Sequence, residues 1–133
     1  MFSSKIKFLF TALFLFGFWE INPAQEADYT AELEYEITYE IELPRLNVKG
    51  FFVNNTTEPV EAEYLLKVSK TGDSNKAVSE QKGPFSATAM ERLLLSESGM
   101  NIDESAEYTI ILEIKNGSEI LAVKSLNIKG QEF

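Results

Sequence analysis

Five glutamates recur at alternate positions between residues 32 and 42, and their carboxylates are the side chains of this sequence best suited to chemistry. Two carboxylates held close together can act as acid and base in the hydrolysis of a glycosidic bond. Several carboxylates that converge on one point can bind calcium. A row of carboxylates can also attract a basic chain from solution. We call this set the acidic row, and its members are Glu32, Glu34, Glu36, Glu40 and Glu42.

The residues between these glutamates determine where the carboxylates point. Every odd position from 33 to 43 is apolar: Leu33, Tyr35, Ile37, Tyr39, Ile41 and Leu43. Because successive side chains of a β-strand alternate between its faces, the segment has one apolar face and one acidic face. Carboxylates two residues apart on a strand are about 6.5 to 7 Å apart, too far for a compact calcium cage. A strand face also forms no pocket that would raise a carboxyl pKa, so we expect no catalytic role and no metal site.

Two interpretations of the acidic row remain open. In the first, the row is a solvated outer face without a binding role. In the second, the strand lies at a sheet edge, where charges discourage self-pairing and attract an extended basic or polar chain while preventing its stable addition. The second interpretation makes the five glutamates candidate partner-binding residues. On another strand, adjacent Phe51 and Phe52 must point to opposite faces, which leaves an exposed binding role open for Phe51.

The composition excludes several classes of function. The 133-residue chain has no cysteine and no histidine, so thiol nucleophiles, histidine-based triads and Cys/His zinc sites are impossible. The net charge is −9, and the segment 26–42 contains seven acidic residues and no basic one. This balance disfavours nucleic acid and anionic membrane surfaces, which bind clustered Lys and Arg. We expect a protein that is not an enzyme and needs no cofactor.

Residues 1–24 have the layout of a secretory signal peptide. Lys5 and Lys7 form a basic head, and an unbroken apolar run of twelve residues follows from Phe8 to Trp19. A membrane-spanning helix needs about 20 apolar residues, so this run is short for an anchor. We therefore predict cleavage between positions 24 and 28, a mature domain over residues 28–133, a periplasmic location and no membrane association after cleavage.

The alternation of apolar and polar residues recurs between turn signals through the rest of the chain. It is regular in segments 46–54, 60–69 and 107–115, and weaker strands are expected at 76–81, within 85–95 and at 119–129. About seven short antiparallel strands in a domain of this size predict an all-β, Ig-like antiparallel β-sandwich. The Cys…Trp…Cys core of antibody domains is missing, so the term Ig-like describes architecture only.

Three local signals predict the connections between these strands. Asn116-Gly117 predicts a type I′ hairpin, and Gly83-Pro84 predicts a break between two strands. The apolar phase is irregular at Lys124-Ser125, which predicts a bulge. Residues 87–98 also fit a short helix, so the strand or helix assignment of residues 85–95 stays open.

Residues 64–117 resemble the curli-assembly chaperones of the CsgC/CsgH group, and in particular its cysteine-free CsgH-like branch. The stretch YLLKVSKTGDSNKAVSEQKGPF carries most of the resemblance, and Leu95 continues it toward the C-terminus. The matching positions are turn and core residues: Lys70, Gly72, Ser74, Ser79, Gln81, Gly83 and Phe85, then Asn101, Ile102, Tyr108, Leu112, Ile114 and Gly117.

The resemblance implies a small Ig-like periplasmic chaperone that keeps a curli-type amyloid subunit soluble. The implied partner is an unfolded subunit or an early oligomer, and the chaperone itself is expected to be a monomer. CsgC-type members carry a Cys-x-Cys pair, so a redox role of that pair cannot apply to this chain. The alternative is a structural or adhesive Ig-like module of the cell envelope that binds a folded protein.

Overall fold

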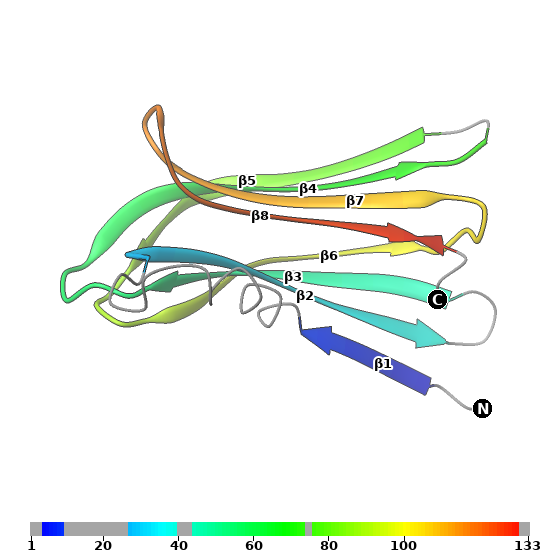
Figure 1. The fold of residues 1–133 in the computed structure, drawn as a ribbon, viewed down its shortest axis with the longest axis horizontal. Coiled ribbons are helices and arrows are strands. Elements are labelled where there is room, and N and C mark those ends of the chain that lie inside the picture. The colour runs from blue at the N-terminus through cyan, green and yellow to red at the C-terminus, as the bar shows by residue number, and fades with distance from the viewer. Residues whose placement is uncertain (1–3, 10–26, 40–43, 74–75, 131–133) are drawn as a thin grey trace, which may run out of the picture.

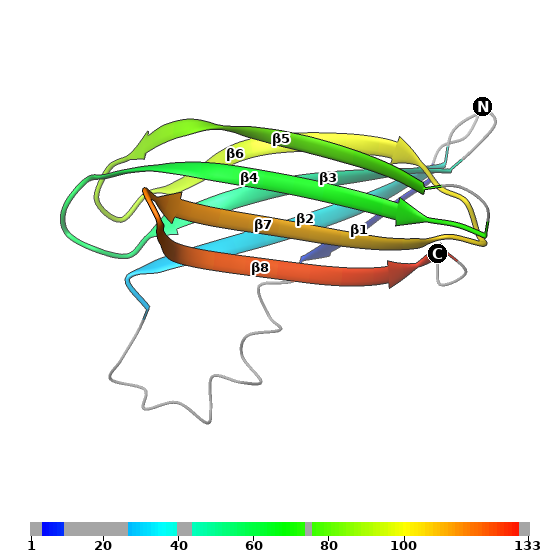
Figure 2. The ribbon, with the colours of Figure 1, turned by 90° about the horizontal axis from the view of Figure 1, so that it is seen from above.

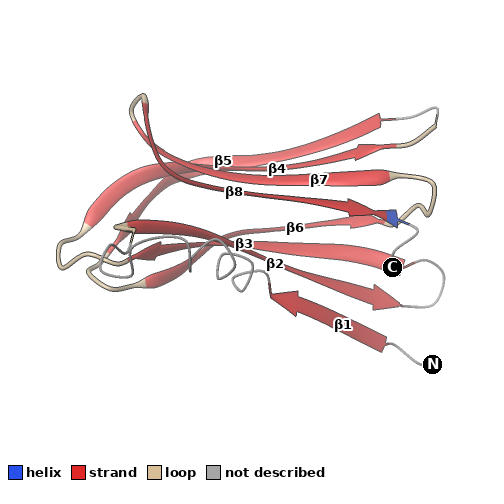
Figure 3. Cartoon of the chain, viewed as in Figure 1, coloured by secondary structure: helices blue, strands red, loops and turns tan. Residues whose placement is uncertain are grey.

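Nearly all the regular structure among the described residues is β-strand. A computed structural model describes residues 4–9, 27–39, 44–73 and 76–130, the first of these as backbone only. Figure 3 shows these residues as strands joined by short loops, with a short helical segment at the end of β8. The strands are β1 (Ser4–Leu9), β2 (Tyr29–Tyr39), β3 (Pro44–Asn54), β4 (Val60–Thr71), β5 (Lys76–Ala87), β6 (Arg92–Asn101), β7 (Glu107–Asn116) and β8 (Glu119–Lys129).

The strands form two four-stranded antiparallel sheets that pack face to face (Figures 1 and 2). One sheet has the order β1-β2-β3-β6 and the other has the order β5-β4-β7-β8. The chain changes sheet after β3, β5 and β6, as in Ig-like sandwiches. Strands β2 to β8 are the seven strands expected from the sequence, so the predicted fold class is confirmed. Strand β1 lies within the segment predicted to be a signal peptide, and cleavage of that segment stays a prediction.

The core lies between the two sheets and uses the strand phases that the sequence predicts. Leu33 and Ile37 of β2 are 0% and 1% exposed, and Phe52 of β3 is fully buried. The other sheet contributes Leu66, Val68, Ile110, Leu112 and Ile114, each at most 1% exposed. Burying an aliphatic or aromatic side chain of this size contributes about 1.5 to 3 kcal/mol, so the sandwich is held together without disulfides.

The region from residue 76 to 101 differs from the prediction. Gly83-Pro84 does not separate two strands, because β5 runs through it. Strand β5 is at a sheet edge, where a proline can be accommodated without breaking a ladder hydrogen bond. Residues 87–98 form no helix, and residues 85–95 are not one strand: β5 ends at Ala87 and β6 begins at Arg92.

The hairpin between β7 and β8 forms where Asn116-Gly117 predicts it, but the turn is of another type. Asn116 pairs with Glu119, so Gly117 and Ser118 are the central residues. Gly117 has a φ of 61°. Ser118 does not have a positive φ, because Met90 is the single non-glycine residue with positive φ among the described residues. Positive φ at the first central position alone is typical of a type II′ turn, not type I′.

The bulge in β8 is not at Lys124-Ser125. Ile114 pairs with Ala122 and Lys115 pairs with Ile120, which leaves Leu121 as the extra residue. The irregular apolar phase of β8 therefore results from a bulge close to the hairpin, several residues before the predicted position.

Asn54 joins two loops at one end of the sandwich from a fully buried position. Its Nδ2 donates to the carbonyl oxygens of Glu58 at 2.8 Å and Thr88 at 2.9 Å. Its Oδ1 accepts from the N–H of Thr56 at 3.0 Å and from the Thr56 hydroxyl at 2.7 Å. The loop after β3 and the turn before β6 are thus held by one amide side chain.

The hydroxyl of Tyr108 fixes the loop between β6 and β7. It accepts a hydrogen bond from the N–H of Asp103 at 2.7 Å and donates to the carbonyl oxygen of Asn101 at 3.2 Å. A tyrosine near the start of the sixth sandwich strand that bonds to backbone just upstream is a known feature of Ig-like folds. Burial raises the pKa of the Tyr108 phenol.

Replacing Asn54 by alanine is expected to lower the free energy of unfolding by about 2 to 4 kcal/mol, because buried partners lose their hydrogen bonds. Chemical denaturation measures this change. Asn55→Ala is the matched control: the Asn55 amide bonds to Ala27 and Thr30 at exposed positions, so a loss below about 1 kcal/mol is expected. Equal losses in the two variants would contradict this role of Asn54.

Tyr108→Phe is expected to destabilise the protein by about 1 to 2 kcal/mol, because the Asp103 N–H loses its acceptor. The pH dependence has a definite sign. Since the pKa of Tyr108 is raised above its ordinary value of 10.0, this group contributes stability below pH 10 that is lost as the pH rises through the folded-state pKa. Denaturation from pH 8 to 11 should therefore show a smaller decline in the phenylalanine variant than in the parent.

Candidate functional site: the acidic face of β2

The described members of the acidic row lie on the outer face of the β1-β2-β3-β6 sheet. The intervening residues Leu33 and Ile37 are buried, so Glu32, Glu34 and Glu36 point away from the core, as the alternation predicts. Glu40 and Glu42 lie outside the described residues. The register of β2 with β3 pairs Glu32 with Phe51, Glu34 with Lys49, and Glu36 with Asn47.

Arg92, the first residue of β6, neutralises part of this row. Its Nε lies 2.8 Å from Oε1 of Glu32, and its Nη2 lies 3.1 Å from Oε2 of Glu34. One guanidinium thus bridges two successive carboxylates of the same face, in the geometry that its planar fork favours. The expectation of a freely solvated row is wrong for these two residues, because their side chains are only 15% and 13% exposed.

The same guanidinium also covers Phe51. The Arg92 Cζ atom lies 3.8 Å from the centroid of the Phe51 ring, within the range of a cation–π contact. Phe51 points outward, as expected, but it is only 9% exposed. An exposed binding role for Phe51 is therefore wrong in this arrangement.

The pKa of Arg92 shows the balance of these contacts. Partial burial by itself lowers the pKa of the guanidinium, but the hydrogen bonds and negative charges of Glu32 and Glu34 outweigh it and raise the pKa above its ordinary value. The Arg92 side chain is still 44% exposed. The bridge is therefore accessible to solvent ions and to a competing charged group.

A lysine of the neighbouring strand β3 lies next to the acidic row. Lys49 lies between Glu34 of β2 and Glu97 of β6 in the register. Glu34, Glu36 and Lys49 are among the residues that line a shallow hollow on this face. Within the described residues, Glu36 has no cationic group at ion-pair distance. Among the described side chains, the face therefore combines two bridged carboxylates with one carboxylate, Glu36, that makes no ion pair.

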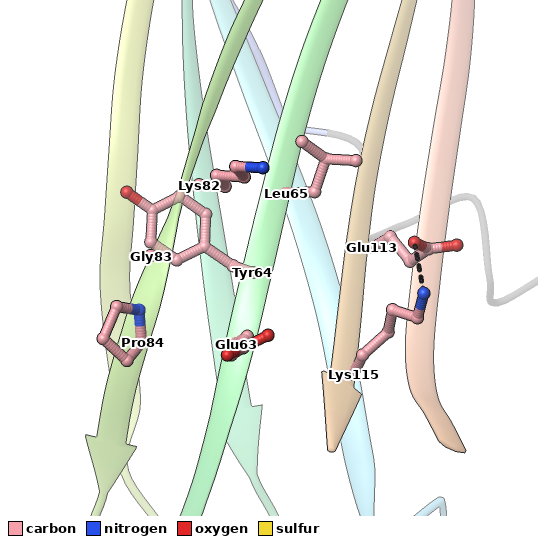
Figure 4. Close-up of a pocket in the computed structure, with 8 residues that line it drawn as sticks. All are labelled: Glu63, Tyr64, Leu65, Lys82, Gly83, Pro84, Glu113 and Lys115. Carbon is pink, nitrogen blue, oxygen red and sulfur yellow. Dashed lines mark ion pairs between the residues drawn. The ribbon is translucent and has the colours of Figure 1, made fainter. Parts of the chain in front are cut away.

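A second hollow lies on the outer face of the other sheet (Figure 4). Leu65 and Pro84 supply apolar surface, and Lys115 Nζ lies 4.0 Å from Glu113 Oε1 at one side. Charges of both signs surround the hollow, which is open to solvent. It holds no nucleophile paired with a base, so it does not have the composition of an active site.

The described residues show neither a metal site nor a membrane-spanning helix. No group of three or more acidic side chains there is arranged to hold a metal ion. The described part of the chain also contains no helix with the length and hydropathy of a membrane span. The Arg92 bridge was not found from the sequence, because Arg92 is 60 and 58 residues away from its two partners.

The fold and this outer face define an Ig-like β-sandwich with a charged sheet surface. The structure is similar to the solution structure of CsgH from R. palustris, with a TM-score of 0.51 and 18% sequence identity over 78% of this chain and 94% of that protein. It is also similar to the E. coli curli protein CsgC, with a TM-score of 0.55 and 13% identity over 71% of this chain and 96% of that protein.

These likenesses extend the resemblance seen in the sequence to the fold of nearly the whole of both proteins. At such low identity they establish the fold alone. No protein-family model and no curated protein matches the chain.

Arg92→Gln is expected to lower the free energy of unfolding by about 1 to 2 kcal/mol at low ionic strength, because it removes an ion-pair bridge and a cation–π contact. The loss should shrink as salt is added, since salt screens the remaining repulsion between Glu32 and Glu34. Arg45→Gln is the matched control, because Arg45 makes one 3.4 Å hydrogen bond, to Asn101, among the described side chains. Equal, salt-independent losses in the two variants would argue against the bridge.

Proposed function

We propose that this protein is a periplasmic chaperone that inhibits premature polymerisation of a curli-type amyloid subunit. The observation that carries the proposal is the fold shared with CsgH and with the curli protein CsgC over 94% and 96% of their lengths. The sequence supports it independently through the predicted signal peptide and through the resemblance of residues 64–117 to the same group.

The physical basis is the way in which amyloid grows. Identical segments add to a fibre edge as strands, and each added strand offers a new edge. A stable sandwich that contacts the unfolded subunit or an early oligomer competes with this addition. Weak, short-lived contacts suit the task, because the subunit must be released for export.

We assign the contact to the acidic row. Glu32 and Glu34 already share Arg92, so a basic side chain of the subunit competes with that bridge. Glu36 makes no ion pair with another described side chain, and we include Glu40 and Glu42 by their place in the sequence. Contacts of this kind are largely electrostatic and weaken with ionic strength.

The proposal also concerns the oligomeric state of the mature protein and its need for other groups. The protein acts as a monomer after removal of its signal peptide, and neither a cofactor nor a catalytic group takes part. The alternative, an adhesive or structural envelope module, predicts a stable complex with a folded partner. A complex of subunit and chaperone that persists through gel filtration would favour that alternative.

The test is fibre formation by a purified curli-type subunit, followed by dye fluorescence with and without this protein. At one tenth of the subunit concentration the protein is expected to lengthen the lag at least twofold, and added salt is expected to reduce the effect. An unchanged lag would contradict the proposed function.

A pair of charge variants localises the effect. The first changes all five glutamates of the acidic row to glutamine and is expected to lose most of the delay. The second makes the same change at five exposed glutamates of the opposite sheet, so that the net charges match: Glu61, Glu63, Glu80, Glu107 and Glu119. Equal loss in both variants would show that net charge, not the acidic row, is responsible.

A further inference from the structure

The four edges of the sandwich differ in how they can receive another strand. On one side, β5 and β6 are linked by side chains between the sheets. Gln81 Nε2 donates to the carbonyl oxygen of Glu97 at 2.8 Å, and the hydroxyls of Ser79 and Ser98 lie 3.4 Å apart. The hydroxyl of Ser96 also donates to the Gln81 side chain. A strand adding to either edge would have to disturb these links.

The edge of β8 carries features that oppose strand addition. The bulge at Leu121 interrupts its regular ladder near the hairpin. Lys124 lies in the middle of the strand, and Lys129 ends it. A bulge and lysines on an edge strand are common protections against pairing with another chain.

The edge of β2 differs, because a strand is already paired with it. Strand β1 lies antiparallel to β2 in six register pairs, from Ser4 opposite Tyr39 to Leu9 opposite Glu34 (Figure 1). The chain between β1 and β2 is long, so this is not a tight hairpin. The pairing places Lys7 opposite Glu36 in the register.

We propose that the β2 edge over residues 34–39 is a strand-acceptor site for an extended segment with basic residues at alternate positions. Residues 4–9, with the sequence SKIKFL, occupy the site while the signal peptide is attached. Removal of the signal peptide leaves β2 as the terminal strand of its sheet. The vacated edge then accepts a basic, otherwise apolar segment of the subunit.

This inference deepens the proposed function and rests on it for the identity of the natural ligand. Backbone hydrogen bonds along the edge hold any extended chain. Glu34 and Glu36 favour basic side chains at the two alternate positions opposite them, and Lys7 of β1 occupies one of these positions. A six-residue strand makes few such bonds, so binding is weak and readily reversed. The acidic row also discourages pairing of β2 with a second copy of itself, because like charges would then face each other.

The first test is an engineered disulfide between β1 and β2, which is unambiguous because the chain has no native cysteine. The chain is produced without export, so that residues 1–24 are retained, and carries Lys5→Cys with Thr38→Cys, two positions that lie opposite in the register. A disulfide is expected to form readily in this variant, and not in the control with Lys5→Cys and Glu32→Cys. Equal yields of disulfide in the two variants would overturn the pairing of β1 with β2.

The second test asks whether the edge binds a separate strand. The probe is the synthetic peptide of residues 4–9, observed by chemical-shift changes in the full chain. A charge-reversed chain with Lys5→Glu and Lys7→Glu is used to weaken the pairing of β1 with β2. This chain is expected to bind the peptide, with chemical-shift changes centred on residues 34–39. The locked chain, in which a disulfide joins positions 5 and 38, is expected to bind the peptide at least tenfold more weakly. Equal binding by both chains, or shifts centred on another edge, would overturn the proposal.

Fibre assays with the same two chains separate this inference from the proposed function. The charge-reversed chain is expected to delay fibres, and the locked chain to lose the delay until the disulfide is reduced. If the locked chain delays fibres equally well, the subunit does not use the β2 edge, although the chaperone function stands. If the peptide binds the edge but neither chain delays fibres, the acceptor site stands and the proposed function fails.

Discussion

The alternation of side chains along β2 is the constraint on which the rest of this structure depends. It places one set of residues in the core and the intervening glutamates on the outer face, and a shift of one residue would exchange the two sets. The buried set holds β2 against the opposite sheet, so the phase is strongly fixed. The acidic row is therefore held in a defined position by the hydrophobic core beneath it.

Once the row is fixed in this way, its charge repulsion must be reduced by other parts of the chain. The segment 26–42 contains no basic residue, and the compensation comes from across the sheet. Arg92 bridges Glu32 and Glu34 and covers Phe51, so an acidic pair, a cation and an aromatic ring form one cluster. Because Arg92 remains partly exposed, the cluster can exchange partners with a charged chain. A surface of this kind suits weak and reversible binding better than tight binding.

Local patterns were sufficient to predict most of the fold and only part of the site. The phases of β2, β3, β4 and β7 follow from period-two alternation, because each strand has one face in the core. The course of β5 through Pro84 could not be predicted, since it depends on β5 being an edge strand. The bridge from Arg92 and the buried amide of Asn54 depend on contacts between distant segments, and no local spacing marks either one.

The proposed pairing joins a basic, extended segment of the subunit to the edge of β2 and leaves the rest of the sandwich unchanged. Amide hydrogen exchange of this protein, measured residue by residue with and without a curli-type subunit, detects such pairing. We expect added protection at residues 34–39, reduced by salt, and no change in β8 or on the outer face of the opposite sheet. Protection centred on β8, or around the hollow at Leu65, would contradict it.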